Sequence, residues 1–254
     1  MKLARILADG VPRLIRVEGT TFRWLDDLTW PARDLGPSQR QLSEFGLLCP
    51  VRPSKIVCVG RNYRAHAREL GHEVPAEPLL FLKPPSALAG PDSMIVLPAQ
   101  STRVEHEGEL AVVIGSRARH VAPTNVHEHI LGYTCANDVT ARDLQKRDVQ
   151  FTRAKGFDTF CPVGPWIETE RPNADATISV RVNGEKRQNG RIGDMVFDVD
   201  TLVSYISHVM TLEFGDVVLT GTPEGVGPLE PGNTVTVSVD GIGTLRNHVS
   251  ARAM

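Results

Sequence analysis

Short apolar runs alternate with glycine- and proline-rich stretches along most of the chain, a pattern typical of many short strands. The 254 residues include 22 glycines and 18 prolines, most of which fall between the apolar runs. One alternating apolar and polar run ends at Asn183-Gly184, a dipeptide that favours a tight hairpin turn. The pattern predicts strands at Lys55–Val59, Leu110–Ile114, Leu131–Asn137, Thr177–Asn183, Val217–Thr220, Thr234–Val239 and Gly243–Val249.

Helical signals are fewer than strand signals. Apolar residues recur at helical spacing over Asp198–Val209, and a second helix is expected over Arg61–Leu70, where glycine follows. A third helix is expected over Thr140–Arg147, because Thr140 followed three residues later by Asp143 is similar to a capping box. Many strands and few short helices predict a β-rich α+β fold.

Length and composition favour one large domain with a small appendage. Residues 1–50 differ from the rest, since they contain Trp24 and a polar stretch rich in Leu, Arg and Ser, and prolines follow at Pro50 and Pro53. We therefore expect a small N-terminal region over residues 1–50 and a main domain over residues 51–254.

Charge and cysteine spacing exclude several classes of protein. The net charge is −2 and no block of like charges stands out, so neither nucleic acid nor an anionic membrane is an expected partner. No apolar run reaches the roughly 18 residues of a membrane span, and the first residues are too briefly apolar for a signal peptide. The four cysteines are widely spaced without a CxxC motif, which favours a reduced cytoplasmic protein over a disulfide scaffold or a zinc site.

The densest group of carboxylates precedes the apolar run Leu110–Ile114. Glu105, Glu107 and Glu109 alternate along the chain, so a strand that begins early places all three on one face. Like charges beside a buried run need a compensating cation. The alternative is an ordinary polar strand end.

Asp138 lies where another predicted strand ends and a helix begins, a position at which mixed proteins often place functional residues. The alternative is that Asp138 or Thr140 only caps the helix. Capping accounts for one of these two residues but not for both.

Two further segments contain residues suited to catalysis or to anion binding. His66 and Glu69 share one face of the predicted helix, which makes them either a water-activating pair or a surface contact. The Gly- and Thr-rich loop Leu219–Gly227 offers amides and hydroxyls to an anion, or is a plain turn. It lacks the GxxxxGK[ST] pattern of a nucleotide-binding P-loop.

In this order the segments resemble the fumarylacetoacetate hydrolase family, in particular its acylpyruvase-like and 2-hydroxyhepta-2,4-diene-1,7-dioate isomerase-like branch. The resemblance covers about residues 50 to 250 and is specific, because many ordered motifs agree. These motifs are Lys55–Tyr63 with His66 and Glu69, Phe81–Pro84, Glu107–Gly115, Gly132–Thr134, Asn137–Asp143, Lys155–Thr159, Cys161–Pro165, Val182–Gly184 and Gly221–Pro223.

The resemblance implies a mixed β-roll that holds a divalent metal with three carboxylates. Carried onto this chain, the ligands are Glu107, Glu109 and Asp138, whereas Glu105 is a neighbour. An all-oxygen set suits a hard ion such as Mg²⁺ or Mn²⁺. Three carboxylates exceed the charge of one divalent ion, so an anionic substrate requires cations nearby.

The resemblance also implies roles for the residues around the metal. Lys155 stabilises negative charge on the substrate, Gln145 is an amide donor near the reacting carbonyl, and Arg142 is the site arginine. Thr222 binds the substrate carboxylate, and His66 with Glu69 forms a lid pair that orients a water. Arg61 is a lesser candidate for the same lid.

The implied substrate is a small 2-oxo or β-diketo acid, and the activity expected first is hydrolysis of the C–C bond of acylpyruvates or fumarylpyruvate. The alternatives are isomerisation or decarboxylation of unsaturated 2-oxo dioic acids in aromatic catabolism, and decarboxylation of oxaloacetate. A catalytically silent binding protein is the alternative outside the enzymes. The resemblance further implies a homodimer.

Overall fold

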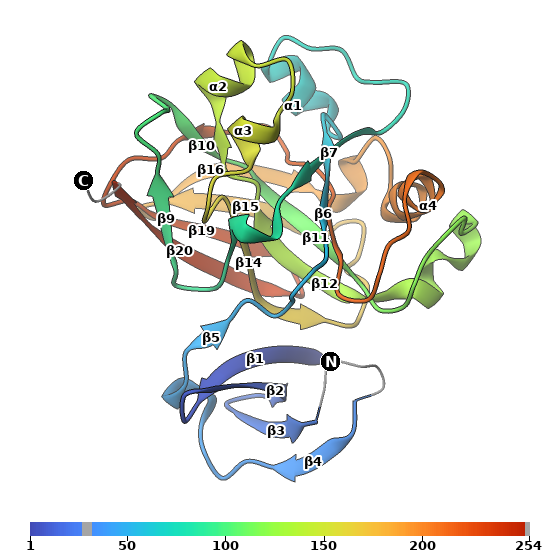
Figure 1. Cartoon of the computed structure of the whole chain (residues 1–254), viewed down its shortest axis with the longest axis vertical. Coiled ribbons are helices and arrows are strands. Elements are labelled where there is room, and N and C mark those ends of the chain that lie inside the picture. Colours follow the sequence, from blue (N-terminus) through green and yellow to red (C-terminus); the bar gives the residue numbers. More distant parts are fainter. Residues whose placement is uncertain (27–31, 252–254) are drawn as a thin grey trace.

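One large mixed sheet joins the N-terminal strands to the rest of the molecule in the computed structural model, which describes residues 1–26 and 32–251 (Figure 1). Its main path runs in the order β4-β3-β2-β1-β14-β12-β11-β17-β6-β7, and β5 and β8 pair with β1 and β14. The strands are β1 (Lys2–Ala8), β2 (Val11–Glu18), β3 (Thr21–Leu25), β4 (Asp34–Pro37), β5 (Leu47–Leu48), β6 (Ile56–Gly60), β7 (Leu79–Lys83), β8 (Leu88–Ala89), β11 (Gly108–Ile114), β12 (Ile130–Asn137), β14 (Cys161–Glu168) and β17 (Val217–Leu219).

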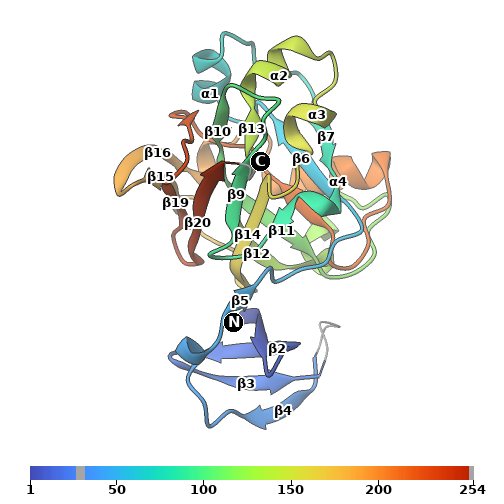
Figure 2. The same cartoon turned by 60° about the vertical axis from the view of Figure 1, so that its left-hand side comes forward.

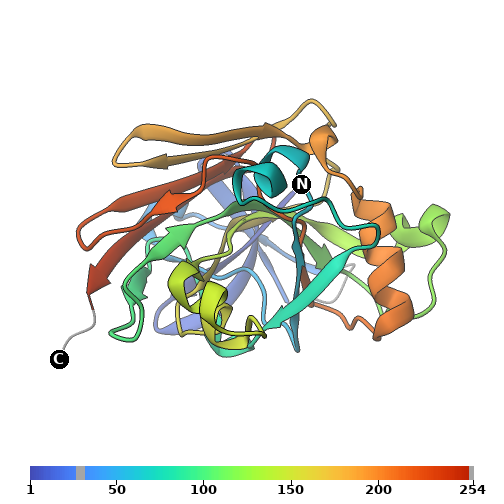
Figure 3. The ribbon, with the colours of Figure 1, turned by 90° about the horizontal axis from the view of Figure 1, so that it is seen from above.

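Two smaller sheets complete the main body. The five-stranded sheet has the order β16-β15-β19-β20-β9, and the three-stranded sheet has the order β13-β10-β18. The five-stranded sheet lies beside the large sheet (Figure 3). Its alternating valines pack on apolar residues of the central strand β11, which is buried along its whole length. The strands are β9 (Met94–Leu97), β10 (Val104–His106), β13 (Thr140–Ala141), β15 (Thr177–Val182), β16 (Glu185–Arg191), β18 (Gly227–Pro228), β19 (Thr234–Val239) and β20 (Gly243–Ala251).

The α-helices are short and lie outside the sheets (Figure 2). They are α1 (Arg64–Glu69), α2 (Arg142–Arg147), α3 (Thr152–Lys155) and α4 (Val199–Val209), with 3-10 segments at Leu42–Glu44, Pro85–Ala87, Pro123–His129 and Ile192–Asp194. Among the helices of residues 1–26 and 32–251, only α4 is long enough to bury a full apolar face. No helix of the described residues is long and apolar enough to cross a membrane.

Every strand expected from the apolar pattern is present, with ends shifted by at most two residues. The hairpin at Asn183-Gly184 joins β15 to β16, and both turn residues have positive φ, as the expected turn type requires. The sheet-rich architecture with few helices is therefore confirmed. The finer description as a β-roll stays a prediction.

The capping box expected at Thr140 is wrong. The α2 helix begins at Arg142, and its N-cap is Ala141, which has no capping side chain. Asp143 instead accepts hydrogen bonds from the hydroxyls of Ser101 and Thr102, so a tertiary contact has replaced the local one. Helix α1 is likewise shorter than expected and begins three residues after Arg61.

The N-terminal strands form a lobe of their own at one end of the molecule (Figures 1 and 2). The strands β1 to β4 pair as an antiparallel meander around a separate apolar cluster that includes Ile6 and Phe22. Strand β1 also pairs with β14, and the terminal amine lies 2.5 Å from Glu168 Oε1, so this lobe is attached to the main sheet. The boundary near residue 50 stays a prediction, and residues 27–31 and 252–254 of the expected regions lie outside the described ones.

Candidate active site

A cavity of about 590 Å³ lies beside the start of β11 and brings together segments that are far apart in sequence. Its walls come from β6, α1, β7, β10, β11, the residue after β12, α2, α3 and the loop after β17. Every site residue expected from the sequence lines this cavity, namely Arg61, His66, Glu69, Glu107, Glu109, Asp138, Arg142, Gln145, Lys155 and Thr222.

The carboxylates of Glu107, Glu109 and Asp138 converge in this cavity. One oxygen of each lies within 4.8 Å of the others, and all three residues are buried. Glu109 is the second residue of β11 and Glu107 immediately precedes this strand, and both carboxylates reach the cluster. Strand β12 pairs with β11 in antiparallel fashion, and the Asp138 amide donates to the Glu107 carbonyl at 2.8 Å, so the pairing register brings Asp138 to the cluster.

Gly108 separates the two glutamates and has no room for a side chain. A Cβ atom at this position would lie 2.2 Å from Val180 Cγ2 of the second sheet. The chain passes here from β10 in the three-stranded sheet to β11 in the large sheet, and side chains hold this junction. The Glu107 amide donates to Asn137 Oδ1 at 2.9 Å, and the Gly108 amide donates to Gln188 Oε1 at 3.0 Å.

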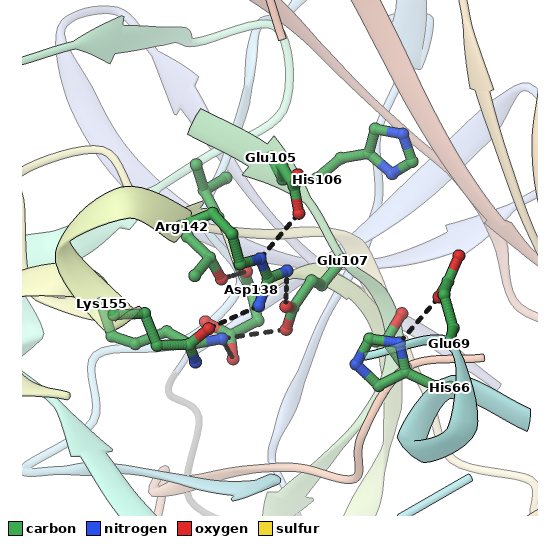
Figure 4. A network of polar contacts seen from close by, with 12 residues as sticks. His66, Glu69, Glu105, His106, Glu107, Asp138, Arg142 and Lys155 are labelled. Atoms are coloured by element: carbon green, nitrogen blue, oxygen red, sulfur yellow. Dashed lines mark hydrogen bonds and ion pairs between the residues drawn. The ribbon is translucent and has the colours of Figure 1, made fainter. Parts of the chain in front are cut away.

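Buried cations compensate the carboxylates (Figure 4). Lys155 Nζ lies 2.9 Å from Glu107 Oε2 and 2.7 Å from Asp138 Oδ2, and Arg142 donates to the other Glu107 oxygen. Burial alone would lower the pKa of Lys155, but Asp138 and Glu107 raise it to about 12. Burial would raise the pKa of Glu107, but Lys155 and Arg142 hold it well below its usual range. The sequence-based expectation that this group of acids needs cations is therefore confirmed.

Glu105 stands apart from the cluster of three carboxylates. Its oxygens accept from Arg103 Nε at 2.6 Å and from Arg142 Nε at 2.7 Å. Arg142 therefore bridges Glu105 and Glu107, and it also donates to Gln145 Oε1 at 2.6 Å. Glu105 is therefore held by two arginines, and its role as a neighbour of metal ligands stays a prediction.

The chemistry of the donor set fits a divalent cation. Three buried carboxylates offer oxygen ligands only, which Mg²⁺ and Mn²⁺ prefer over zinc-type nitrogen and sulfur sets. The surrounding lysine and arginine partly neutralise the same oxygens. Glu107, Glu109 and Asp138 would hold such an ion at the floor of the cavity.

Metal binding at this cluster is expected to release a proton. Burial raises the pKa of Glu109 well above its usual range, and the neighbouring Asp138 and Glu107 raise it further. Below that pKa the proton must leave before the oxygen can bind a cation. The affinity for Mn²⁺ should therefore rise with pH, by up to about tenfold per pH unit. Calorimetric titration in buffers of different ionisation enthalpy measures the released proton, and an affinity independent of pH would contradict this expectation.

Lys83 is a site residue that the sequence-based assignment omitted. Its Nζ lies 2.5 Å from Asp138 Oδ1 and 3.0 Å from the Val139 carbonyl, and the residue is only 1% exposed. Together with Lys155, it covers both oxygens of Asp138 with a positive charge. Lys83 belongs to the Phe81–Pro84 motif and lies in the edge strand β7. Its partner Asp138 is far away in sequence, so the spacing of residues could not predict this contact.

Replacing Lys83 by methionine is expected to lower the free energy of unfolding by about 1–3 kcal/mol, because Asp138 and the Val139 carbonyl lose a buried donor. Chemical denaturation measures this change. The exposed Lys186→Met variant serves as the control, since it removes the same charge from the surface. An unchanged denaturation midpoint for Lys83→Met would show that its ion pair does not contribute to stability.

His66 and Glu69 face the same cavity from α1 (Figure 4). His66 is 4% exposed, and its Nδ1 lies 3.2 Å from Glu69 Oε2. The other Glu69 oxygen accepts the Gly225 amide at 3.0 Å, which ties α1 to the loop after β17. The imidazole of the pair is therefore buried at the cavity, whereas Glu69 is exposed and contacts it from the surface side.

The hydroxyl of Thr222 already has partners in this structure. It donates to the Gly108 carbonyl at 2.8 Å and accepts from Gln188 Nε2 at 2.8 Å. In this arrangement it has no hydrogen left to donate to a substrate carboxylate. The Thr222 amide has no acceptor among the described residues, so the backbone is the available donor at this position.

Comparison with known proteins agrees with this geometry. Residues 55–250 match the family model described as fumarylacetoacetate (FAA) hydrolase C-terminal. The chain belongs to the fumarylacetoacetate hydrolase family. The matched region begins at β6 and ends in β20, so it contains every residue that lines the cavity.

Three relatives of the family show the range of its reactions. Oxaloacetate tautomerase YisK of Bacillus subtilis is 41% identical over 238 residues, covering 86% of this chain and 78% of that protein. The structure of 2-hydroxyhepta-2,4-diene-1,7-dioate isomerase from Mycobacterium marinum superposes with a TM-score of 0.90 at 44% identity and covers 100% of both chains. Fumarylpyruvate hydrolase from Pseudomonas aeruginosa, in complex with Mn²⁺ and pyruvate, has a TM-score of 0.75 at 35% identity and covers 85% of this chain and 93% of that one.

Proposed function

We propose that the protein is a divalent-metal-dependent enzyme that interconverts keto and enol or double-bond isomers of small 2-oxo dicarboxylic acids, of which oxaloacetate is the simplest. One observation carries the proposal: the buried carboxylate cluster, Lys155 and the His66–Glu69 pair line the same cavity. Isomerisation next to a 2-oxo group needs stabilisation of negative charge on oxygen and a base that moves a proton. Both parts are present at this site.

The charge balance of the cavity supports a substrate with two carboxylates. Its lining contains as many lysine and arginine side chains as carboxylates, and Lys83 lies just behind Asp138. A divalent ion at the cluster would therefore leave a surplus of positive charge. Arg61 and Lys146 have no ion-pair partner among the described residues, so they are the cations available to the second carboxylate.

The residues of this chain divide the proposed reaction between them. A bound divalent ion supplies Lewis-acid stabilisation of negative charge on the substrate. Lys155 adds a fixed positive charge near this negative charge, since its raised pKa keeps it protonated. His66, held by Glu69, takes the proton from the carbon next to the 2-oxo group and returns it at the new position.

Hydrolysis of the C–C bond of acylpyruvates or fumarylpyruvate is the second candidate. The specific observation in its favour is the contact of the buried His66 with Glu69, a pair suited to deprotonate a water as well as a carbon acid. Here it stands second because it also requires an ordered water beside the second carbonyl. In addition, the more similar relatives named above are a tautomerase and an isomerase.

Decarboxylation of oxaloacetate or of an unsaturated 2-oxo dioic acid needs the same stabilisation of charge but no base. It is therefore proposed only as a side reaction of this site. Aromatic catabolism is the proposed metabolic setting, on the strength of the isomerase relative.

The proposal includes Mg²⁺ or Mn²⁺ as the cofactor, a cytoplasmic setting and a homodimer. All four cysteines are free thiols, as a reducing compartment permits. Light scattering at micromolar concentration tests the oligomeric state, and a monomer would contradict that part of the proposal.

A substrate panel tests the proposed function. Purified protein with Mg²⁺ is given enol-oxaloacetate, an unsaturated 2-hydroxy dioic acid, an acylpyruvate and fumarylpyruvate, and loss of each is followed by absorbance and product analysis. Conversion of the first two without cleavage is the expected result. Cleavage of the acylpyruvate or fumarylpyruvate at a higher kcat/KM would make hydrolysis the principal activity, and no turnover of any of the four would contradict the proposal.

A further inference from the structure

Gln188 is buried on a strand whose other side chains are largely exposed. It lies in the middle of β16 and is 1% exposed, whereas its neighbours Arg187 and Asn189 face solvent. Strand β16 is the outer strand of the five-stranded sheet and carries none of the residues that line the cavity. A buried amide at such a position requires partners, because an unpaired one would be destabilising.

The amide of Gln188 uses its full hydrogen-bonding capacity. Its Oε1 accepts from His106 Nδ1 and from the Gly108 amide, both at 3.0 Å. Its Nε2 donates to Thr222 Oγ1 at 2.8 Å and to the Pro223 carbonyl at 2.7 Å. One side chain therefore joins the junction of β10 and β11 to the loop after β17.

The loop 221–227 also lies directly against the backbone of β16. A Cβ atom at Gly225 would lie 2.1 Å from the Arg187 carbonyl oxygen, and one at Gly190 would lie 2.5 Å from Pro223 Cβ. Contact this close leaves no room for a shift of the loop toward the strand. The position of the loop is therefore set by β16, with Gln188 as its polar connection.

This loop reaches three parts of the candidate active site. The Gly221 amide donates to Glu109 Oε2 at 2.7 Å, the Gly225 amide donates to Glu69, and Thr222 lines the cavity. We propose that Gln188 is a positioning residue, which fixes the loop 221–227 and through it orients Thr222 and Glu69 relative to the carboxylate cluster. It acts through these residues, since it does not line the cavity itself.

Hydrogen–deuterium exchange tests the proposal without any substrate. Gln188→Met keeps the length of the side chain and removes all four hydrogen bonds, and Asn189→Met on the exposed face is the matched control. The expected result is exchange in the loop 221–227 that is about tenfold faster or more, with the Gly108 amide also faster but β11 beyond Gly108 and β12 unchanged. Unchanged exchange in the loop, or an equal rise in every strand, would overturn the proposal.

Kinetics provide the second readout, and this part rests on the proposed function. Gln188→Met should raise KM and lower kcat, each by about tenfold, while the Kd of Mn²⁺ changes by less than about threefold. In a Thr222→Val background, Gln188→Met should raise KM much less, because both changes act on the same contact. Equal effects of Gln188→Met in the two backgrounds would overturn positioning through Thr222. If no substrate is turned over, the proposed function fails while the exchange experiment still decides the role of Gln188.

Discussion

Replacing Lys155 by methionine is expected to lower turnover about 10²–10³-fold while leaving the affinity for divalent metal undiminished. Lys155 contacts Glu107 and Asp138, two of the three carboxylates that would hold the ion. Its positive charge therefore competes with the cation for these oxygens, so its removal does not weaken metal binding. Turnover suffers because negative charge builds on the substrate only as the reaction proceeds, and Lys155 stabilises that charge.

Steady-state kinetics at saturating Mn²⁺, together with a metal titration of the same variant, separate these two effects. The control is Lys186→Met, which removes an exposed lysine outside the cavity. Activity close to that of the unmodified protein would exclude Lys155 from the mechanism. A large loss of metal affinity would show instead that Lys155 organises the cluster.

Replacing His66 by alanine is expected to reduce isomerisation by about 10²–10⁴-fold, the usual effect of losing a general base. Glu69→Gln should have a smaller effect, because the imidazole remains but loses the carboxylate that orients it. Decarboxylation of oxaloacetate, where present, should change far less in both variants, since breaking that C–C bond needs charge stabilisation but no base. Neither variant should alter the affinity for Mn²⁺, because neither residue belongs to the carboxylate cluster.

The ratio of isomerisation to decarboxylation, measured on the same protein sample, gives the decisive comparison. His127→Ala removes an exposed histidine and serves as the control. An equal fall of both reactions would indicate that His66 and Glu69 close the site rather than transfer a proton. Unchanged isomerisation would exclude His66 as the base.

Local sequence pattern predicted the parts of the fold that depend on local physics. Thr234–Val239 alternates apolar and polar residues and forms β19 at the predicted positions, and the Asn183-Gly184 turn needs only its own backbone preference. The first four strands were not predicted. Their separate apolar cluster is small, and polar or charged residues interrupt their apolar positions.

In the candidate site too, residues recognisable from local spacing were predicted, whereas residues that depend on distant contacts were not. Glu107 and Glu109 are recognisable because they are two residues apart at the beginning of an apolar run, although the structure begins β11 only at Gly108. Lys83 and Gln188 were not assigned, since each contacts residues more than thirty positions away in sequence: Lys83 contacts Asp138, and Gln188 contacts Thr222 and Pro223. At Asp143 distant contacts made a local prediction wrong, because its hydrogen bonds with Ser101 and Thr102 replaced the local cap that the sequence suggested.

The most direct test is the rate at which the protein converts enol-oxaloacetate to its keto form, measured with Mg²⁺ and again after removal of metal by a chelator. Conversion far above the uncatalysed rate with Mg²⁺, lost on chelation and restored by added Mg²⁺ or Mn²⁺, is the predicted result. The same loss is predicted for Glu109→Gln with the metal present, because one of the three carboxylates is then missing. Conversion that is indifferent to the chelator and to Glu109→Gln would contradict a metal-dependent reaction at this cluster.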